Sequence, residues 1–122
     1  MYECNSIIYI AVDSENTEII QLLLSNEKID VSILNIIIIK DDDLQHEITA
    51  LYSAYLTKNI GIIKLLLNNE KTDVNILNII DYYQKTILYS AVKDKNIEII
   101  QIILNNEKTD VNTLNIYDYE YE

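Results

Sequence analysis

One segment of this 122-residue sequence occurs three times, and this repetition limits the fold more than any other feature. The string LLLNNEKTDVN ends at Asn75, a close copy ends at Asn112, and a weaker copy, LLLSNEKIDVS, ends at Ser32. When Thr49–Asn75 is aligned with Thr86–Asn112, 19 of 27 positions are identical. Such internal similarity is typical of chains in which each unit buries its apolar face against the next unit. We therefore expect one core that is built by stacking repeated units.

Each unit is predicted to begin with a short helix. The strings TALYSAYL and TILYSAVK place apolar residues three and four positions apart, which is the spacing of one helix face. Ser6, Thr49 and Thr86 stand where a side-chain oxygen can cap the helix N-terminus. A polar break follows, and we interpret its last residue as the left-handed residue that ends the helix: Asn16, Asn59 and Asn96.

A second, more apolar helix follows in each unit. Its three versions, TEIIQLLL, IGIIKLLL and IEIIQIIL, are apolar nearly all round, so we expect burial between neighbouring units. Leu67 and Leu104 occupy the same position in two of these helices, and both are predicted to be buried. The segments Ile33–Ile48 and Ile76–Lys85 mix Ile and Tyr with Asp, which favours extended, hairpin-like loops.

The repeated pattern resembles the ankyrin repeat, whose consensus begins T-P-L-H-x-A and closes L-L-L-x-x-G-A-D-V-N. Thr49, Leu51 and Ala54 match its beginning, Asp73–Asn75 match its close, and the third unit matches in the same way. The resemblance spans about residues 5 to 112. It implies an all-α fold, an α-solenoid of stacked helix-turn-helix units with long hairpin-like loops.

Several positions depart from the ankyrin consensus. Tyr52 stands at the consensus His, Ala50 at the Pro, and Lys58 at the Gly between the helices. The units are spaced 43 and 37 residues apart when they are aligned on Ala11, Ala54 and Ala91, and both spacings exceed that of the family. Loops tolerate such insertions, so these departures predict lower stability rather than another fold.

The whole chain, residues 1–122, is predicted to be a single domain. Its three repeats are expected at about residues 5–32, 48–75 and 85–112. Residues 113–122, TLNIYDYEYE, align with ILNIIDYYQK and are expected to begin an incomplete fourth repeat. The chain is then either a short natural product or a piece of a longer array. The acidic, Tyr-rich end is either an edge strand or a disordered tail.

The charge of the chain limits the kinds of partner that it can bind. A formal net charge of −11 and a pI of about 4.3 argue against nucleic acids and anionic membrane surfaces, both of which are bound through Lys and Arg. A protein partner with a basic surface fits this charge. Cys4 is the only cysteine, which suits a reducing compartment, and no signal peptide is visible. We expect a cytoplasmic protein, with the nucleus left open.

No reaction chemistry is predicted. The only His and the only Cys, His46 and Cys4, are expected in a loop and in the N-terminal segment, which disfavours a nucleophile pair. The run Asp41–Asp43 offers Ca²⁺ ligands but lacks the alternation and Gly of an EF-hand loop, so a solvated loop tip is the better interpretation. The only Gly, Gly61, lies within a predicted helix and excludes a phosphate-binding loop. We expect no enzyme, no cofactor, no metal and no small-molecule substrate.

The resemblance implies a binding face that is made of hairpin tips and exposed first-helix residues. Carried over by position, the protein-binding residues are Asp13, Ser14, Leu56, Thr57, Lys93 and Asp94, together with Tyr82 and Tyr83 at a loop tip. Tyr52 and Tyr89 recur in register, so they are expected to pack between repeats. The predicted function is non-catalytic recognition of a protein partner. The alternative is a spacer or regulatory segment of a longer array.

Overall fold

A computed structural model describes residues 6–35, 38–39, 46–80 and 83–113 of the chain. Its helices are α1 (Ile7–Ser14), α2 (Thr17–Ser25), α3 (Val31–Leu34), α4 (Ala50–Thr57), α5 (Ile60–Asn68), α6 (Ile87–Lys93) and α7 (Ile97–Leu104). Its strands are β1 (Ile38–Ile39), β2 (His46–Ile48), β3 (Asn78–Ile80) and β4 (Tyr83–Lys85). The predicted succession of helix pairs and hairpins is therefore present.

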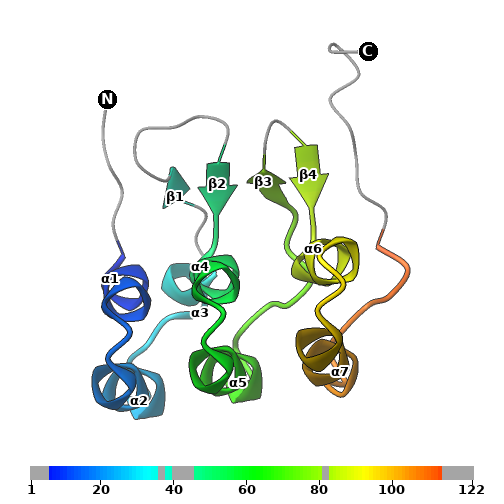
Figure 1. The fold of residues 1–122 in the computed structure, drawn as a ribbon. Coiled ribbons are helices and arrows are strands. Elements are labelled where there is room, and N and C mark those ends of the chain that lie inside the picture. Colours follow the sequence, from blue (N-terminus) through cyan, green and yellow to red (C-terminus); the bar gives the residue numbers. More distant parts are fainter. Residues whose placement is uncertain (1–5, 36–37, 40–45, 81–82, 114–122) are drawn as a thin grey trace.

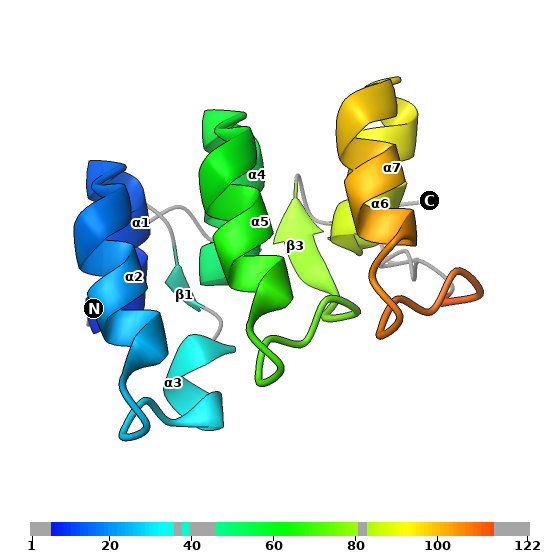
Figure 2. The ribbon, with the colours of Figure 1, turned by 90° about the horizontal axis from the view of Figure 1, so that it is seen from below.

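The helices form two layers. The first helices of the three units, α1, α4 and α6, make one layer, and the second helices, α2, α5 and α7, make the other (Figure 1). Seen from the second layer, the three helix pairs stand in a row (Figure 2). Helices of neighbouring units pack against one another within each layer, α1 on α4 and α2 on α5. The stack confirms that repetition builds the core.

The hairpins form one small sheet beside the first layer. Its strands are in the order β1-β2-β3-β4 and all pairs are antiparallel. Strand β2 pairs with β3 through Glu47 and Ile79, so the sheet joins the hairpins that precede the second and the third helix pairs (Figure 1). The expected hairpin-like loops are thus hairpins, and the pairing of β2 with β3 connects neighbouring units in addition to the packing of their helices.

A short helix, α3, overlaps the first two residues of Ile33–Ile48, a segment that was expected to be extended. The Asp30 carboxylate accepts hydrogen bonds from the Ser32 backbone N–H and hydroxyl, both at 2.8 Å, and the Leu34 N–H donates to the Asp30 carbonyl. These Ser32 hydrogen bonds also hold the pKa of Asp30 below its usual value. The local bonding of Asp to the backbone outweighs the extended preference of the Ile residues that follow.

The predicted caps of the first helices are confirmed. The side chains of Ser6, Thr49 and Thr86 accept hydrogen bonds from the third residue beyond each, at 3.0, 3.2 and 3.1 Å. The prediction for the break that follows is wrong by one residue. The left-handed residues are those that precede each Asn, with φ angles of 57°, 61° and 59°: Glu15, Lys58 and Lys95.

The three Asn residues instead begin the second helices. Each has an extended backbone, and its side-chain oxygen accepts the N–H of the residue three positions on, at 3.1 to 3.2 Å: Asn16, Asn59 and Asn96. An Asn in this position satisfies an orphan donor of the new helix, which an αL Asn would leave unpaired. The consensus Gly position therefore keeps its left-handed conformation although it holds Glu or Lys here.

Replacing Lys95 with Gly is expected to raise the free energy of unfolding by about 0.5–1 kcal/mol. The left-handed conformation brings the Cβ of an L-residue against its own backbone, whereas Gly adopts this conformation freely. The larger conformational entropy of Gly in the unfolded chain offsets part of this gain in the free energy of unfolding. Urea denaturation of dilute protein measures the change. Lys95→Ala is the control, because it removes the charge but keeps the Cβ. Equal stabilisation by Ala and Gly would contradict this explanation.

The centre of the stack is buried on both sides and its ends are not. In α5, Ile62, Ile63, Leu66 and Leu67 are all at most 2% exposed, as predicted for a helix between neighbours. Leu104, the copy of Leu67 in α7, is 50% exposed, so its predicted burial is wrong. Helix α7 packs on α5 on one side, and no other described helix lies beyond it. A position that faces the next unit is therefore buried only where a next unit follows.

Candidate functional site

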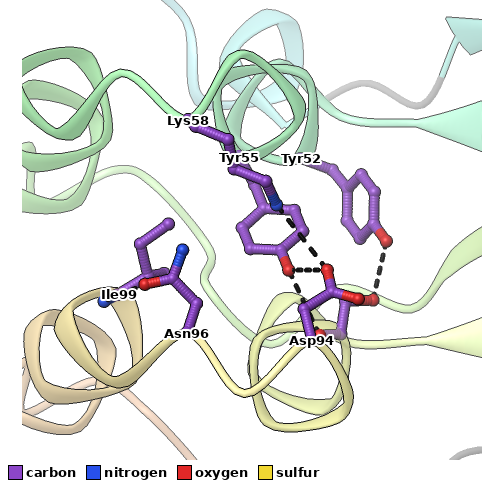
Figure 3. Close-up of polar contacts among 7 residues, drawn as sticks. Tyr52, Tyr55, Lys58, Asp94, Asn96 and Ile99 are labelled. Atoms are coloured by element: carbon purple, nitrogen blue, oxygen red, sulfur yellow. Dashed lines mark hydrogen bonds and ion pairs between the residues drawn. The ribbon is translucent and has the colours of Figure 1, made fainter.

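Two tyrosines join the second unit to the third on the first-helix layer (Figure 3). Tyr52 and Tyr55 extend from α4 with their rings edge to face, 5.5 Å apart. The Tyr52 hydroxyl lies 2.6 Å from the Ser90 Oγ of α6, and the Tyr55 hydroxyl donates to the Ser90 carbonyl at 3.1 Å. Both residues are at most 3% exposed. The expected inter-repeat role of Tyr52 is confirmed, and Tyr55 shares it.

Asp94 and Lys58 complete this network. The Tyr55 hydroxyl shares its one proton between the Ser90 carbonyl and the Asp94 carboxylate, and this carboxylate pairs with the Lys58 ammonium at 3.6 Å (Figure 3). The same Lys58 nitrogen lies 3.4 Å from the centre of the Tyr55 ring, within the range of a cation–π contact. Burial, with the hydrogen bond to Asp94, raises the pKa of Tyr55 above its usual value. The network therefore holds α4 and α6 in a fixed relation.

A hollow of about 340 Å³ lies against this network. Its walls come from α4, from α6 and from the end of β4, with the residues Tyr52, Tyr55, Leu56, Lys85, Ser90, Lys93 and Asp94. Leu56 is 40% exposed and supplies an apolar wall. Lys85 and Lys93 supply two cations, while the carboxylate of Asp94 is already bonded. We call this feature the α4–α6 hollow.

An aromatic side chain stands near the α4–α6 hollow. Tyr83, on β4, is 37% exposed, and the Lys85 ammonium lies 5.8 Å from the centre of its ring. The same ammonium lies 5.7 Å from the ring of Tyr89, which is half-buried. Lys85 therefore links the wall of the hollow to an exposed tyrosine.

The structure places the predicted binding residues in two groups. Leu56, Lys93 and Asp94 all line the α4–α6 hollow, and Tyr83 stands near it. Thr57 lies beside Leu56, but its hydroxyl donates to the Ala54 carbonyl of its own helix at 2.7 Å. At the other end of the layer Asp13 is exposed, and the Ser14 hydroxyl donates to the Ala11 carbonyl at 2.7 Å. Tyr82 lies outside the described residues.

Sequence reasoning missed Tyr55, Lys58 and Lys85. A signal for Tyr55 exists, because the same position holds Val12 in the first unit and Val92 in the third. A tyrosine that replaces a valine at one junction brings a hydroxyl that needs a partner when it is buried. Asp94, which is Ser14 in the first unit and Thr57 in the second, provides that partner.

Two larger hollows lie on the second-helix layer. One, of about 450 Å³, lies between α5 and α7, and another, of about 400 Å³, lies between α2 and α5. Asn68 and Glu70 contribute to both, and the other lining residues are largely register copies, such as Lys71 and Lys108. Because the same hollow recurs at both junctions, it follows from how the units stack, and we do not assign it a ligand.

The described part of the chain offers no site for a metal, since none of its His, Cys, Asp and Glu residues form a group of three. Cys4 and the Asp41–Asp43 run lie outside the described residues, and of His46 only the backbone, in β2, is described. No helix in the described ranges is long and apolar enough to cross a bilayer.

The fold and this site define a class: a helical repeat protein in which stacked helix-turn-helix units carry hairpins along one side. The family model described as Ankyrin repeats (3 copies) matches residues 8–115. The chain therefore belongs to the ankyrin-repeat family, whose members are typically non-catalytic protein-interaction modules. No curated protein and no solved structure matches the chain.

Proposed function

We propose that this chain is a recognition module that binds a protein partner on the face made by its first helices and hairpins, at the α4–α6 hollow. The observation that carries the proposal is the composition of this hollow. An exposed apolar wall, Leu56, stands beside two cations, Lys85 and Lys93, with the exposed Tyr83 close by. Partly exposed aromatic and apolar groups beside charged groups are typical of protein interfaces.

The rigidity of the site supports binding. The Tyr52 and Tyr55 hydroxyls and the Lys58–Asp94 ion pair fix α6 against α4 without any partner present. A surface that is already ordered loses little side-chain and loop entropy when it binds. The α4–α6 hollow is therefore suited to a partner that inserts a side chain between two helices of fixed spacing.

Charge acts on two length scales at this site. The whole chain carries −11, which favours a partner whose wider surface is basic and speeds its approach. Within the hollow the balance is reversed, because Lys85 and Lys93 face one carboxylate that is already paired with Lys58. We propose that the group inserted into the hollow is an acidic side chain or a carbonyl, carried on a basic or mixed surface.

Affinity capture with a matched pair of variants tests this proposal. The bait is the intact chain, and the test variants are Leu56→Asp and Lys93→Glu. Each is expected to weaken binding of a captured protein at least tenfold, about 1.4 kcal/mol, because each changes the wall of the hollow. Quantitative mass spectrometry identifies the protein, and calorimetry with the purified partner measures Kd.

Lys64→Glu is the control. Lys64 is exposed on α5, in the second-helix layer, and the substitution changes the net charge by the same amount as Lys93→Glu. A partner that binds the α4–α6 hollow keeps its affinity for the control. Equal weakening by both Lys variants would show that only overall charge matters. Unchanged binding to Leu56→Asp and Lys93→Glu would place the binding face elsewhere.

A further inference from the structure

The two ends of the stack expose positions that are buried inside it. Ile19 of α2 is 45% exposed, whereas its copies Ile62 and Ile99, which lie in units that follow another unit, are fully buried. Leu104 of α7 is 50% exposed, whereas its copy Leu67 is 2% exposed and faces the following unit. Each end thus shows one side of the contact that joins the units within the chain.

The first-helix layer repeats this pattern. Ile7 is 65% exposed and its copies Ala50 and Ile87 are at most 3% exposed, while Val92 is 55% exposed and its copy Val12 is buried. We define the N-terminal end face by Ile7, Ile10, Ile19 and Leu22, each at least 45% exposed. We define the C-terminal end face by Val92, Ile97, Leu104 and Val111, each at least 50% exposed. Exposed apolar side chains that gather at one end of a fold mark contact surfaces.

The lysine hydrogen bonds between units all run from one unit to the unit before it. The Lys108 ammonium donates to the Asn69 and Thr72 carbonyls of the preceding unit, both at 2.7 Å, and Lys71 donates to the Ile29 carbonyl at 3.0 Å. The copy of these lysines at the N-terminal end is Lys28, which is exposed. The residues of the third unit that correspond to Asn69 and Thr72 are Asn106 and Thr109. If the third unit of a second copy preceded the first unit in the register of Lys108, Lys28 would therefore reach the carbonyls of that copy's Asn106 and Thr109.

Asparagine amides provide a second directional bond. The Asn75 side chain donates to the Lys108 carbonyl and accepts from the Asp110 N–H of the following unit, both at 2.8 Å. Its copy at the C-terminal end is Asn112, which is exposed. By the same register, Asn112 would bond the Lys28 carbonyl and the Asp30 N–H of a unit placed beyond it.

The charges of the two ends are also complementary. The turn between the helices carries Asp13 and Glu15 in the first unit and Lys93 and Lys95 in the third. Glu15 accepts a hydrogen bond from the Asn59 amide of the second unit at 3.3 Å, and Lys93 lines the α4–α6 hollow, so Asp13 and Lys95 are the charges that the two ends offer. Asp94 lies between the two lysines and is already paired with Lys58. Complementary charge of this kind orients two surfaces and fixes their register.

We infer that the C-terminal end face binds the N-terminal end face of a second copy of this chain, so that copies stack head to tail with the register of the internal units. Apolar positions, hydrogen-bond donors and acceptors, and charge all match between the two faces, which favours a second copy over an unrelated partner. A head-to-tail contact leaves one face of each kind open at the ends, so it does not close at the dimer. This surface is separate from the α4–α6 hollow.

Sedimentation equilibrium tests this inference. The weight-average mass of the intact chain is expected to rise above 14.2 kDa as its concentration increases from about 10 µM to about 1 mM, and to pass twice that value. Ionic strength is held at about 0.15 M to screen the repulsion between copies that each carry −11. A mass that stays at 14.2 kDa throughout, or levels off at the dimer, overturns the inference.

Two single-face variants establish the direction. Ile19→Glu blocks the N-terminal end face and Leu104→Glu blocks the C-terminal end face, so each variant alone is expected to remain monomeric. An equal mixture retains one good face of each kind, and it is expected to form a one-to-one dimer and nothing larger. A mixture that remains monomeric, or either variant associating alone, contradicts the head-to-tail contact.

Controls separate association from folding. Gln101→Glu changes an exposed α7 residue whose copy Lys64 is exposed in the central unit, and it is expected to associate like the intact chain. Ile10→Glu and Val92→Glu provide a second pair on the first-helix layer, and circular dichroism checks the helicity of every variant. Weakened association in Gln101→Glu would show that added charge, not the end face, is responsible.

Discussion

Leu67→Ala is expected to lower the free energy of unfolding by about 2–5 kcal/mol, and Leu104→Ala to lower it by less than about 1 kcal/mol. The two residues hold the same position in neighbouring units, but Leu67 is 2% exposed and Leu104 is 50% exposed. Truncation of Leu67 opens a cavity between α5 and α7, while truncation of Leu104 removes contacts from a surface that is already half in water. Since small domains have a free energy of unfolding of only about 5–15 kcal/mol, Leu67→Ala is expected to remove a large part of the stability of the fold.

Urea denaturation monitored by circular dichroism measures both changes at the same low protein concentration. Low concentration matters, because Leu104 lies on the C-terminal end face and would be covered if copies stacked. A loss below about 1 kcal/mol for Leu67→Ala would contradict burial between units. A large loss for Leu104→Ala in the monomer would show that some part of the chain covers the end of the stack.

The sequence predicts the helix pairs because their signals are local. Threonine caps, three- and four-residue apolar spacing and polar breaks each depend on a few neighbouring residues, and Thr49 and Thr86 cap as predicted. The misplaced left-handed residue shows the limit of such local signals. Asn59 suits both a left-handed end and an N-cap, and its hydrogen bond to the Ile62 N–H decides for the N-cap.

Burial at the ends could not be read from the pattern, because it depends on what lies beyond each unit. Leu67 and Leu104 sit in nearly identical sequences, yet only Leu67 has a following unit among the described residues. The binding residues were predicted by position, and three of them, Leu56, Lys93 and Asp94, line one hollow. Lys85 was missed, because its place at the hollow depends on how β4 meets α6.

Tyr55→Phe is expected to remove a contribution to stability that is present at neutral pH and is lost at alkaline pH. At neutral pH the loss is expected to be about 1–2 kcal/mol, because the hydroxyl donates to the Ser90 carbonyl and to the charged, half-exposed carboxylate of Asp94. In Tyr55→Phe the Ser90 carbonyl still accepts a hydrogen bond from the Asp94 N–H, so the substitution leaves no backbone carbonyl there without a hydrogen bond. The buried ring remains, and its contact with Tyr52 is kept.

The sign of the pH dependence follows from the direction of the pKa shift. Burial and the bond to Asp94 raise the pKa of Tyr55 in the folded chain above the usual 10.0. Above pH 10 the unfolded chain therefore releases this proton while the folded chain retains it, so folding loses about 1.4 kcal/mol per pH unit from this one group. Below pH 10 the contribution is fully present.

Urea denaturation between about pH 8 and pH 12 compares the intact chain with Tyr55→Phe. The stability of the intact chain is expected to fall more steeply above pH 10, so that the two curves meet at about pH 11 and cross above it. Tyr83→Phe is the control, because it removes the same hydroxyl from a side chain that is 37% exposed, and it is expected to keep the steeper fall. Parallel curves for the intact chain and Tyr55→Phe would mean that the Tyr55 hydroxyl is not held between α4 and α6. The network that fixes these two helices on either side of the α4–α6 hollow would then be absent.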